Sequence, residues 1–171
     1  MKRPAEEIWP NKLTPSERAL DTAFLKTRRE ILREWRQLGE QQHAQSNLSE
    51  SRDDWFARTV YRQLRSMVRD GSWSILQKRL DHTRSLKRGR HPIENRPFKI
   101  GLIEFLGETI PYLPNRRAEL SDAMEYAYVH RVSSKYFNGF VKQAGRKQIA
   151  KKLKCNHVEP GFERSPMLNC P

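Results

Sequence analysis

The sequence predicts a mostly α-helical fold, a compact helical domain with an N-terminal helical extension. Apolar residues recur at helical spacing in several segments, capping residues precede these segments, and glycine or proline residues end them. The chain has 171 residues and is 36% hydrophobic, which is enough for one domain with a modest core. The predicted organisation is an arm and a long helix over residues 1–50, a helical domain over 51–154 and a turn-rich tail over 155–171.

A long helix is predicted to begin near Thr14. Thr14 can act as the cap, Pro15 suits the first helical position, and Glu17 can return the capping hydrogen bond. Gly39 lowers helix propensity, so a polar linker is expected over residues 40–50. Between these points the apolar residues form one stripe, composed of Leu20, Phe24, Ile31, Trp35 and Leu38.

Two shorter helices are predicted next. The first begins after Ser51 and carries Asp53 and Asp54 in its first turn, where the helix dipole favours acidic side chains. The turn at residues 70–72 contains a glycine, which ends this helix, and a serine that can cap the next one. That next helix is expected to run to about Thr83. The tryptophans of these segments are interpreted as core residues.

The second half of the domain follows a basic, proline-containing loop over residues 85–97. A short buried helix is expected from residue 98 to the prolines near 111. Asn115 can cap a further helix, and Ser133 or Ser134 can cap a last core helix. Six Lys or Arg and no acid then lie between residues 142 and 154, in a basic segment with little to bury.

The charge of the chain indicates a polyanionic partner. Its formal net charge is +13 and its pI is about 10.1. Such an excess points to nucleic acid first and to an anionic membrane surface second. No apolar run approaches the roughly 18 residues of a membrane span, and the N-terminus lacks the apolar core of a signal peptide. A cytoplasmic protein is therefore expected.

The sequence offers no convincing catalytic or metal site, so a non-enzymatic protein without cofactors is expected. The five histidines are scattered and form no metal-binding pair, and no glycine-rich phosphate loop follows a predicted strand. Asp53 and Asp54 are adjacent and point to different helix faces. A nuclease built from dispersed carboxylates is the enzymatic alternative. Cys155 and Cys170 are expected to be free thiols, with a disulfide as the alternative.

Residues 96–146 contain an ordered set of motifs. The segment opens with RPFKIG at residues 96–101. It then places Ser133 three residues before Tyr136, with Gly139 three and Arg146 ten residues after that tyrosine. This order resembles the ProQ/FinO family of bacterial RNA chaperones, whose domain opens with R-P-L-K-I-G and has S-x-x-Y at its last core helix. The resemblance implies a ProQ/FinO-like core over 96–146 and a short β-hairpin after Arg146. It also implies a basic face that binds the base of an RNA stem and its single-stranded 3′ tail.

The resemblance and the charge together predict the residues that contact RNA. Cationic side chains would bind phosphates, which makes affinity depend steeply on salt. Tyr136 would hydrogen-bond a phosphate or stack on an unpaired base, and its alternative role is that of a core tyrosine. The predicted nucleic-acid-binding residues are Arg96, Lys99, Arg116, Arg117, Arg131, Ser133, Tyr136, Lys142, Arg146 and Lys147.

Two other functions are consistent with the sequence. A basic helical regulator would bind duplex DNA through a helix-turn-helix, although no helix pair has a clear recognition helix. A ribonucleoprotein subunit would use the apolar stripe of residues 14–38 to dock a partner protein or a second copy of itself.

Overall fold

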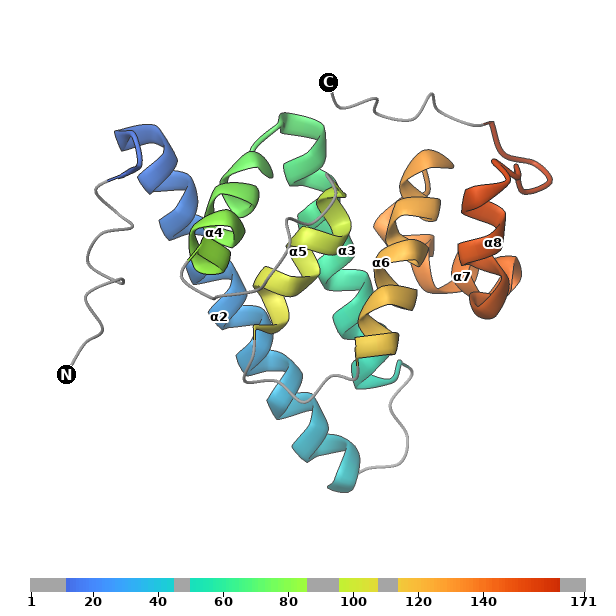
Figure 1. Ribbon diagram of the computed structural model, residues 1–171. Helices are drawn as coiled ribbons and strands as arrows, with labels where there is room; N and C mark the ends of the chain where they lie inside the picture. Colours follow the sequence, from blue (N-terminus) through green and yellow to red (C-terminus); the bar gives the residue numbers. More distant parts are fainter. Residues whose placement is uncertain (1–11, 45–49, 86–95, 108–113, 164–171) are drawn as a thin grey trace.

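The computed structural model of this protein describes residues 12–44, 50–85, 96–107 and 114–163 (Figure 1). Most of these residues lie in helices. These residues contain no strand, so the mostly α-helical prediction is confirmed. The elements in chain order are α2 (Pro15–Ala44), α3 (Arg52–Asp70), α4 (Ser74–Ser85), α5 (Pro97–Leu106), α6 (Pro114–Val129), the 3-10 helix η2 (Ser134–Tyr136), α7 (Phe137–Ala144), the 3-10 helix η3 (Arg146–Gln148) and α8 (Ile149–Lys154).

Helix α2 begins with the predicted capping box. The Thr14 N–H donates to Glu17 Oε2 over 2.9 Å, and the Glu17 N–H donates to Thr14 Oγ1 over 3.2 Å. The expected linker after Gly39 is wrong over residues 40–44, which continue the helix. Gly39 is buried against α3, where an added Cβ would lie 2.4 Å from Arg52 Nη1. This packing offsets the poor helix propensity of glycine.

The apolar stripe of α2 packs into the same core as the rest of the described chain. Phe24 meets Phe105 edge-to-face at 5.1 Å between ring centroids, and Trp35 lies 4.9 Å from Phe56. Within the stripe Leu20 is exposed. The structure thus shows most of this stripe covered by the chain itself, which weakens the case for an α2 docking surface or for self-association through it.

Ion pairs fix α2 against α4 and α5. Arg79 of α4 donates to Asp21 of α2 over 2.8 Å and to Glu104 of α5 over 3.1 Å. Arg28 of α2 donates to the backbone oxygen of Phe105 over 2.8 Å. These largely buried polar groups satisfy one another, which removes the penalty of leaving them unpaired in the core.

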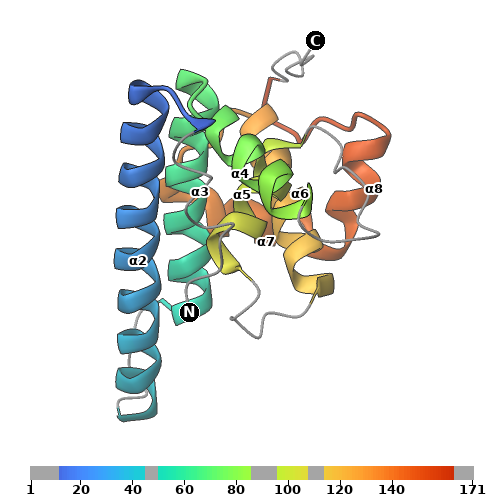
Figure 2. The ribbon, with the colours of Figure 1, turned by 60° about the vertical axis from the view of Figure 1, so that its left-hand side comes forward.

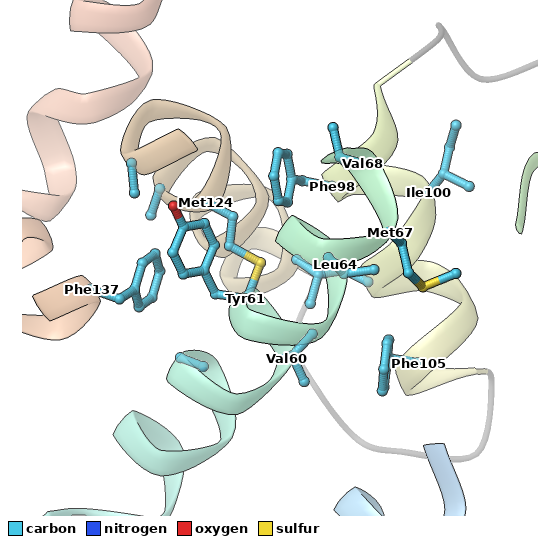
Figure 3. Close-up of a cluster of buried hydrophobic side chains, with 14 of the residues drawn as sticks. Val60, Tyr61, Leu64, Met67, Val68, Phe98, Ile100, Phe105, Met124 and Phe137 are labelled. Atoms are coloured by element: carbon cyan, nitrogen blue, oxygen red, sulfur yellow. The ribbon is translucent and has the colours of Figure 1, made fainter. Parts of the chain in front are cut away.

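Helix α3 runs through the centre of the fold and begins and ends as predicted. The Ser51 side chain accepts a hydrogen bond from the Asp54 N–H, and Gly71 is left-handed at the other end. Its buried side chains meet those of α5, α6 and α7, as Figure 3 shows. Tyr61 stacks on Phe137 with ring centroids 4.5 Å apart, and its hydroxyl donates to the backbone oxygen of Val132 over 2.8 Å.

Helices α5 and α6 pack against each other beside α3. The short helix predicted from residue 98 is present as α5 and ends at Gly107, so the expected extension toward residue 111 lies partly outside the described residues. Asn115 was expected to cap α6, but this helix already begins at Pro114. Pro114 suits this place because its missing N–H would have no partner in the first turn. The basic loop expected over 85–97 lies mostly outside the described residues.

The C-terminal part differs most from the expectation. The β-hairpin implied after Arg146 is absent, because residues 146–154 form η3 and α8, with Ile149 buried. The tail expected over 155–171 is packed as far as Phe162. Phe162 meets Phe140 edge-to-face at 5.1 Å, so the partly buried Phe162 anchors this turn-rich segment against the core. Residues 164–171, including Cys170, lie outside the described residues, whereas Cys155 is a free, exposed thiol.

Hydrogen bonds hold this tail in place. His130 is buried, with Nδ1 2.7 Å from the Tyr126 oxygen, and its Nε2 accepts the Glu159 N–H over 3.1 Å. The Glu159 carboxylate accepts from the Tyr126 hydroxyl over 2.8 Å and from Lys152 over 2.6 Å. Burial raises the pKa of Glu159, but the hydrogen bonds from Lys152 and Tyr126 outweigh this effect and the pKa lies below its usual value. The carboxylate therefore stays ionised and joins α6, α8 and the tail.

Candidate nucleic-acid interface

Residues 131–154 form the most one-sided charged segment of the chain. They contain eight Lys or Arg and no Asp or Glu. Seven of these cations are exposed, and Lys152, bound to Glu159, is the exception. Within this segment α8 lies on the side of the molecule opposite α2 in both ribbon views (Figures 1 and 2), whereas α7 contacts the start of α3 through Asn138. A large anion can therefore reach α8 without meeting α2. The start of α3 adjoins α2, because Trp35 Nε1 donates to Asp53 Oδ1 over 3.3 Å.

Three predicted cations from different elements converge on the start of α3. Arg116 of α6 lies 3.8 Å from an Asp53 oxygen, while Lys142 of α7 and Arg146 of η3 lie 3.6 Å and 3.9 Å from oxygens of Asp54. We call Arg116, Lys142 and Arg146 the basic cluster. Its members lie between residues 116 and 146 in the chain, yet the fold of α6, α7 and η3 brings them to one helix end.

The ion pairs of the basic cluster are loose. All three exceed the hydrogen-bond range, and the cationic side chains are 62%, 70% and 60% exposed for Arg116, Lys142 and Arg146. Exposed ion pairs contribute only about 0–1 kcal/mol to stability. The carboxylates thus keep the cations at the start of α3 through weak ion pairs. Breaking these ion pairs costs little free energy, so the cations can donate to phosphate oxygens instead.

A rigid contact beneath the cluster positions α7 on α3. The Asn138 amide donates to the backbone oxygen of Asp54 over 2.9 Å and to Glu50 Oε1 over 3.0 Å. Glu50 also accepts two hydrogen bonds from Arg58, at 2.9 Å and 2.7 Å. The hydrogen bonds from Arg58 hold the pKa of Glu50 below its usual value despite partial burial. Lys142, one turn after Asn138, is placed by this contact.

Tyr136 projects from the start of α7 into solvent. Its side chain is 63% exposed, the highest value among the exposed large hydrophobic residues that the structure describes. The interpretation as a core tyrosine is therefore wrong. Lys135 Nζ lies 5.5 Å from the centre of the Tyr136 ring. An exposed ring beside cations can stack on an unpaired base, because every base has a π face.

Arg96 has a structural partner that its motif did not reveal. Its guanidinium donates to Asp122 over 2.6 Å and to Glu125 over 2.9 Å, both on α6. Its side chain is 27% exposed. In the free protein Arg96 therefore joins the start of α5 to α6 and lies outside the basic cluster.

The other predicted residues are spread around the same half of the molecule. Lys99 of α5 and Arg117 of α6 are half-buried. Arg131 is exposed and adopts a left-handed conformation with φ of 55° in the turn after α6. Ser133 precedes η2 without a capping hydrogen bond from its side chain, and Lys147 is exposed on η3. The structure thus brings three of the ten predicted residues to the start of α3 and leaves Tyr136 at the end of η2, just before α7.

Three further cations belong to this half of the surface and were not predicted. Lys135 lies beside Tyr136, and Lys151 and Lys154 are exposed on α8. Lys147, Lys151 and Lys154 have the sequence spacing i, i+4 and i+7 across η3 and α8. This spacing in a run without acids was the sequence signal that identifies them. Lysines near a helix C-terminus also interact well with the helix dipole, which is a purely structural reason for part of this stripe.

Comparisons with known proteins gave no match: no family model, no curated protein and no solved structure matches this chain. In the part of the chain that the structure describes, no group of His, Cys, Asp and Glu side chains is arranged to hold a metal ion. None of the described helices combines the length and the apolar character required to cross a bilayer.

Proposed function

We propose that this protein binds structured RNA, namely a stem-loop with a single-stranded 3′ tail. The observation that carries the proposal is the exposed ring of Tyr136 beside Lys135, in a segment with eight cations and no acid. Cations alone attract any polyanion. An exposed aromatic ring among them favours a ligand with unpaired bases, which duplex DNA does not offer.

The two kinds of side chain would divide the ligand between them. Lys142, Arg146 and Arg116 would neutralise phosphates at the start of α3, and Lys147 of η3 with Lys151 and Lys154 of α8 would extend this electrostatic surface. Tyr136 would stack on a base of the tail. Phosphate contacts fix the position of the RNA, and the stacked base gives the preference for a tail.

The biological role that fits such binding is that of an RNA chaperone or post-transcriptional regulator of the ProQ/FinO type. It would act in the cytoplasm on small regulatory or messenger RNA, as a binding protein without enzymatic activity or cofactor. The ordered motifs of residues 96–146 support this role, and the helical η3–α8 segment in place of a hairpin would make the chain a divergent member.

A competition assay at two salt concentrations tests the proposal. Labelled stem-loop RNA with a single-stranded 3′ tail is bound to the full chain and competed with the blunt stem or with duplex DNA of equal length. We expect the tailed RNA to bind more tightly, by about tenfold or more, at both salt concentrations, since stacking of a base contributes about 1–3 kcal/mol. Equal competition by duplex DNA would overturn the proposal in favour of a DNA-binding regulator.

A further inference from the structure

Gly139 stands out among the glycines that the structure describes. Four of the others have a positive φ, and at Gly39 and Gly101 a Cβ would meet Arg52 or Leu64 within 2.4 Å. At Gly139 the backbone is helical and a Cβ would meet nothing within 4 Å. Neither the backbone conformation nor the packing of the folded protein requires a glycine at this position.

This glycine is also unfavourable for the helix that contains it. Helix α7 is only eight residues long, and glycine is the poorest helix former after proline. The opposite face of α7 is fully used for packing, with Phe137, Phe140, Val141 and Ala144 buried. An alanine at residue 139 would therefore suit the isolated protein better.

The surroundings of Gly139 indicate what approaches it. Its neighbours three and four residues away along the chain are Lys135 and Tyr136 at the end of η2, and Lys142 and Gln143 on α7. All four are exposed, two are cations, one is the exposed tyrosine, and none is acidic. A bare stretch of helix backbone between a ring and a cation matches a phosphodiester chain better than a protein surface, which would bring apolar side chains.

We infer that Gly139 is the place where the RNA backbone crosses α7, closer to the helix than any side chain would permit. The inference rests on the proposed function and adds a steric requirement to it. One phosphodiester would lie against the Gly139 backbone, with the ammonium of Lys142 on one side and the ring of Tyr136 on the other. Glycine serves such sites because it has no Cβ to hold the ligand away.

Three variants of the full chain test this inference: Gly139→Ala, Gly139→Gln and the control Ala19→Gln. Ala19 is an exposed position on α2, on the side of the molecule opposite α8 (Figure 2). Binding to the tailed stem-loop is measured by fluorescence anisotropy over a series of salt concentrations. Thermal unfolding is followed by circular dichroism.

We expect the substitutions at Gly139 to maintain or raise thermal stability, whereas a long side chain at this position should lower the affinity for RNA. Gly139→Ala should raise Tm by about 1–4 °C, because a helical glycine is replaced. Gly139→Gln should weaken binding about tenfold without lowering Tm, since a side chain now occupies the place of the ligand. The slope of log Kd against log salt should stay unchanged, because no cation is removed. Ala19→Gln should bind as the unchanged protein does.

The outcomes separate the inference from the function on which it rests. If the unchanged protein prefers the tailed RNA and Gly139→Gln binds it within threefold of the same affinity, the inference is overturned and the proposed function stands. A protein partner would then be the better explanation for the bare helix face. If the unchanged protein shows no preference for the tailed RNA, both fall together. A loss of more than threefold with an unchanged salt slope supports the inference.

Discussion

The Oδ2 of Asp54 lies 3.6 Å from the Nζ of Lys142. Asp54 is in the first turn of α3, where it also approaches Arg146, and its N–H is held by the Ser51 cap. A carboxylate thus occupies the position among the cations that a phosphate would take. It keeps Lys142 and Arg146 in place, and under the proposed function it would compete with RNA for them.

Replacing Asp54 with Asn should therefore strengthen RNA binding. We expect a gain of about two- to tenfold in affinity at low salt, because one negative charge is removed beside two phosphate-binding cations. Stability should fall by about 0.3–1 kcal/mol, since α3 loses an acidic residue in its first turn. Anisotropy titration and urea unfolding measure the two effects. Weaker binding by a folded Asp54→Asn protein would show that orientation of the cations outweighs competition.

Arg146→Ala should weaken binding without unfolding the protein. One fewer phosphate contact should reduce the slope of log Kd against log salt by about 0.7–0.9. The side chain is 60% exposed and its ion pair is long, so Tm should hardly change. Lys26→Ala, an exposed cation of α2, removes the same charge at a distant site and is the matched control. Equal effects of both variants would mean that net charge alone governs binding.

Two substitutions of Tyr136 distinguish stacking of its ring on a base from hydrogen bonding by its hydroxyl. Tyr136→Ala should cost about 1–3 kcal/mol of binding free energy for the tailed stem-loop and much less for the blunt stem. Tyr136→Phe should bind as the unchanged protein does if the ring stacks on a base. A loss in Tyr136→Phe as large as that in Tyr136→Ala would instead assign the role to the hydroxyl. Tm should be nearly unchanged in both, because the side chain is exposed.

Arg96 should behave as a structural residue. Arg96→Ala leaves the partly buried carboxylates of Asp122 and Glu125 without their partner, and should cost about 1–3 kcal/mol of unfolding free energy. Arg96→Lys should recover only part of this, because lysine cannot donate to two carboxylates from a planar fork. Urea unfolding measures the loss. An Arg96→Ala protein with unchanged stability and weakened RNA binding would place Arg96 back among the RNA contacts.

The Glu50–Arg58 pair gives a pH dependence of stability. Its hydrogen bonds place the folded pKa of Glu50 below the ordinary value of 4.5. Between the folded pKa of Glu50 and pH 4.5, the unfolded chain binds more protons than the folded one, so the free energy of unfolding rises with pH in this range. The contribution is complete above pH 4.5 and is lost as the pH falls through the folded pKa. Glu50→Gln should flatten this part of the curve in unfolding measured from about pH 3 to 7. An unchanged slope in that variant would exclude the contribution.

Much of the helical framework could be predicted from local signals. The Thr14–Glu17 capping box, the Ser51 cap and Gly71 each act within a few residues, so their chemistry is readable in the sequence. The helix was wrongly predicted to end at Gly39, because the contact that accommodates this glycine comes from Arg52 on α3, a separate helix. The packed tail was missed for the same reason, since Glu159 gains its partners only when α6 and α8 have come together.

The candidate site was predictable in its chemistry but not in its geometry. A run of cations without acids is visible in the sequence, and so is Tyr136. That Arg116 approaches Asp53 while Lys142 and Arg146 approach Asp54 depends on the packing of α6 and α7 on α3. Arg96 looked equivalent to the others because its carboxylate partners lie 26 and 29 residues further along the chain.

The Lys152–Glu159 contact shows that a formal charge count overstates the electrostatic reach of this protein. Several other basic side chains are likewise committed to internal partners, namely Arg28, Arg52, Arg58, Arg79 and Arg96. An alanine scan that treats every Lys and Arg alike would mix defects in folding with defects in binding. If the cations are first sorted by their internal partners, the same set of variants reports separately on the residues that stabilise the fold and on those that are free to contact a ligand.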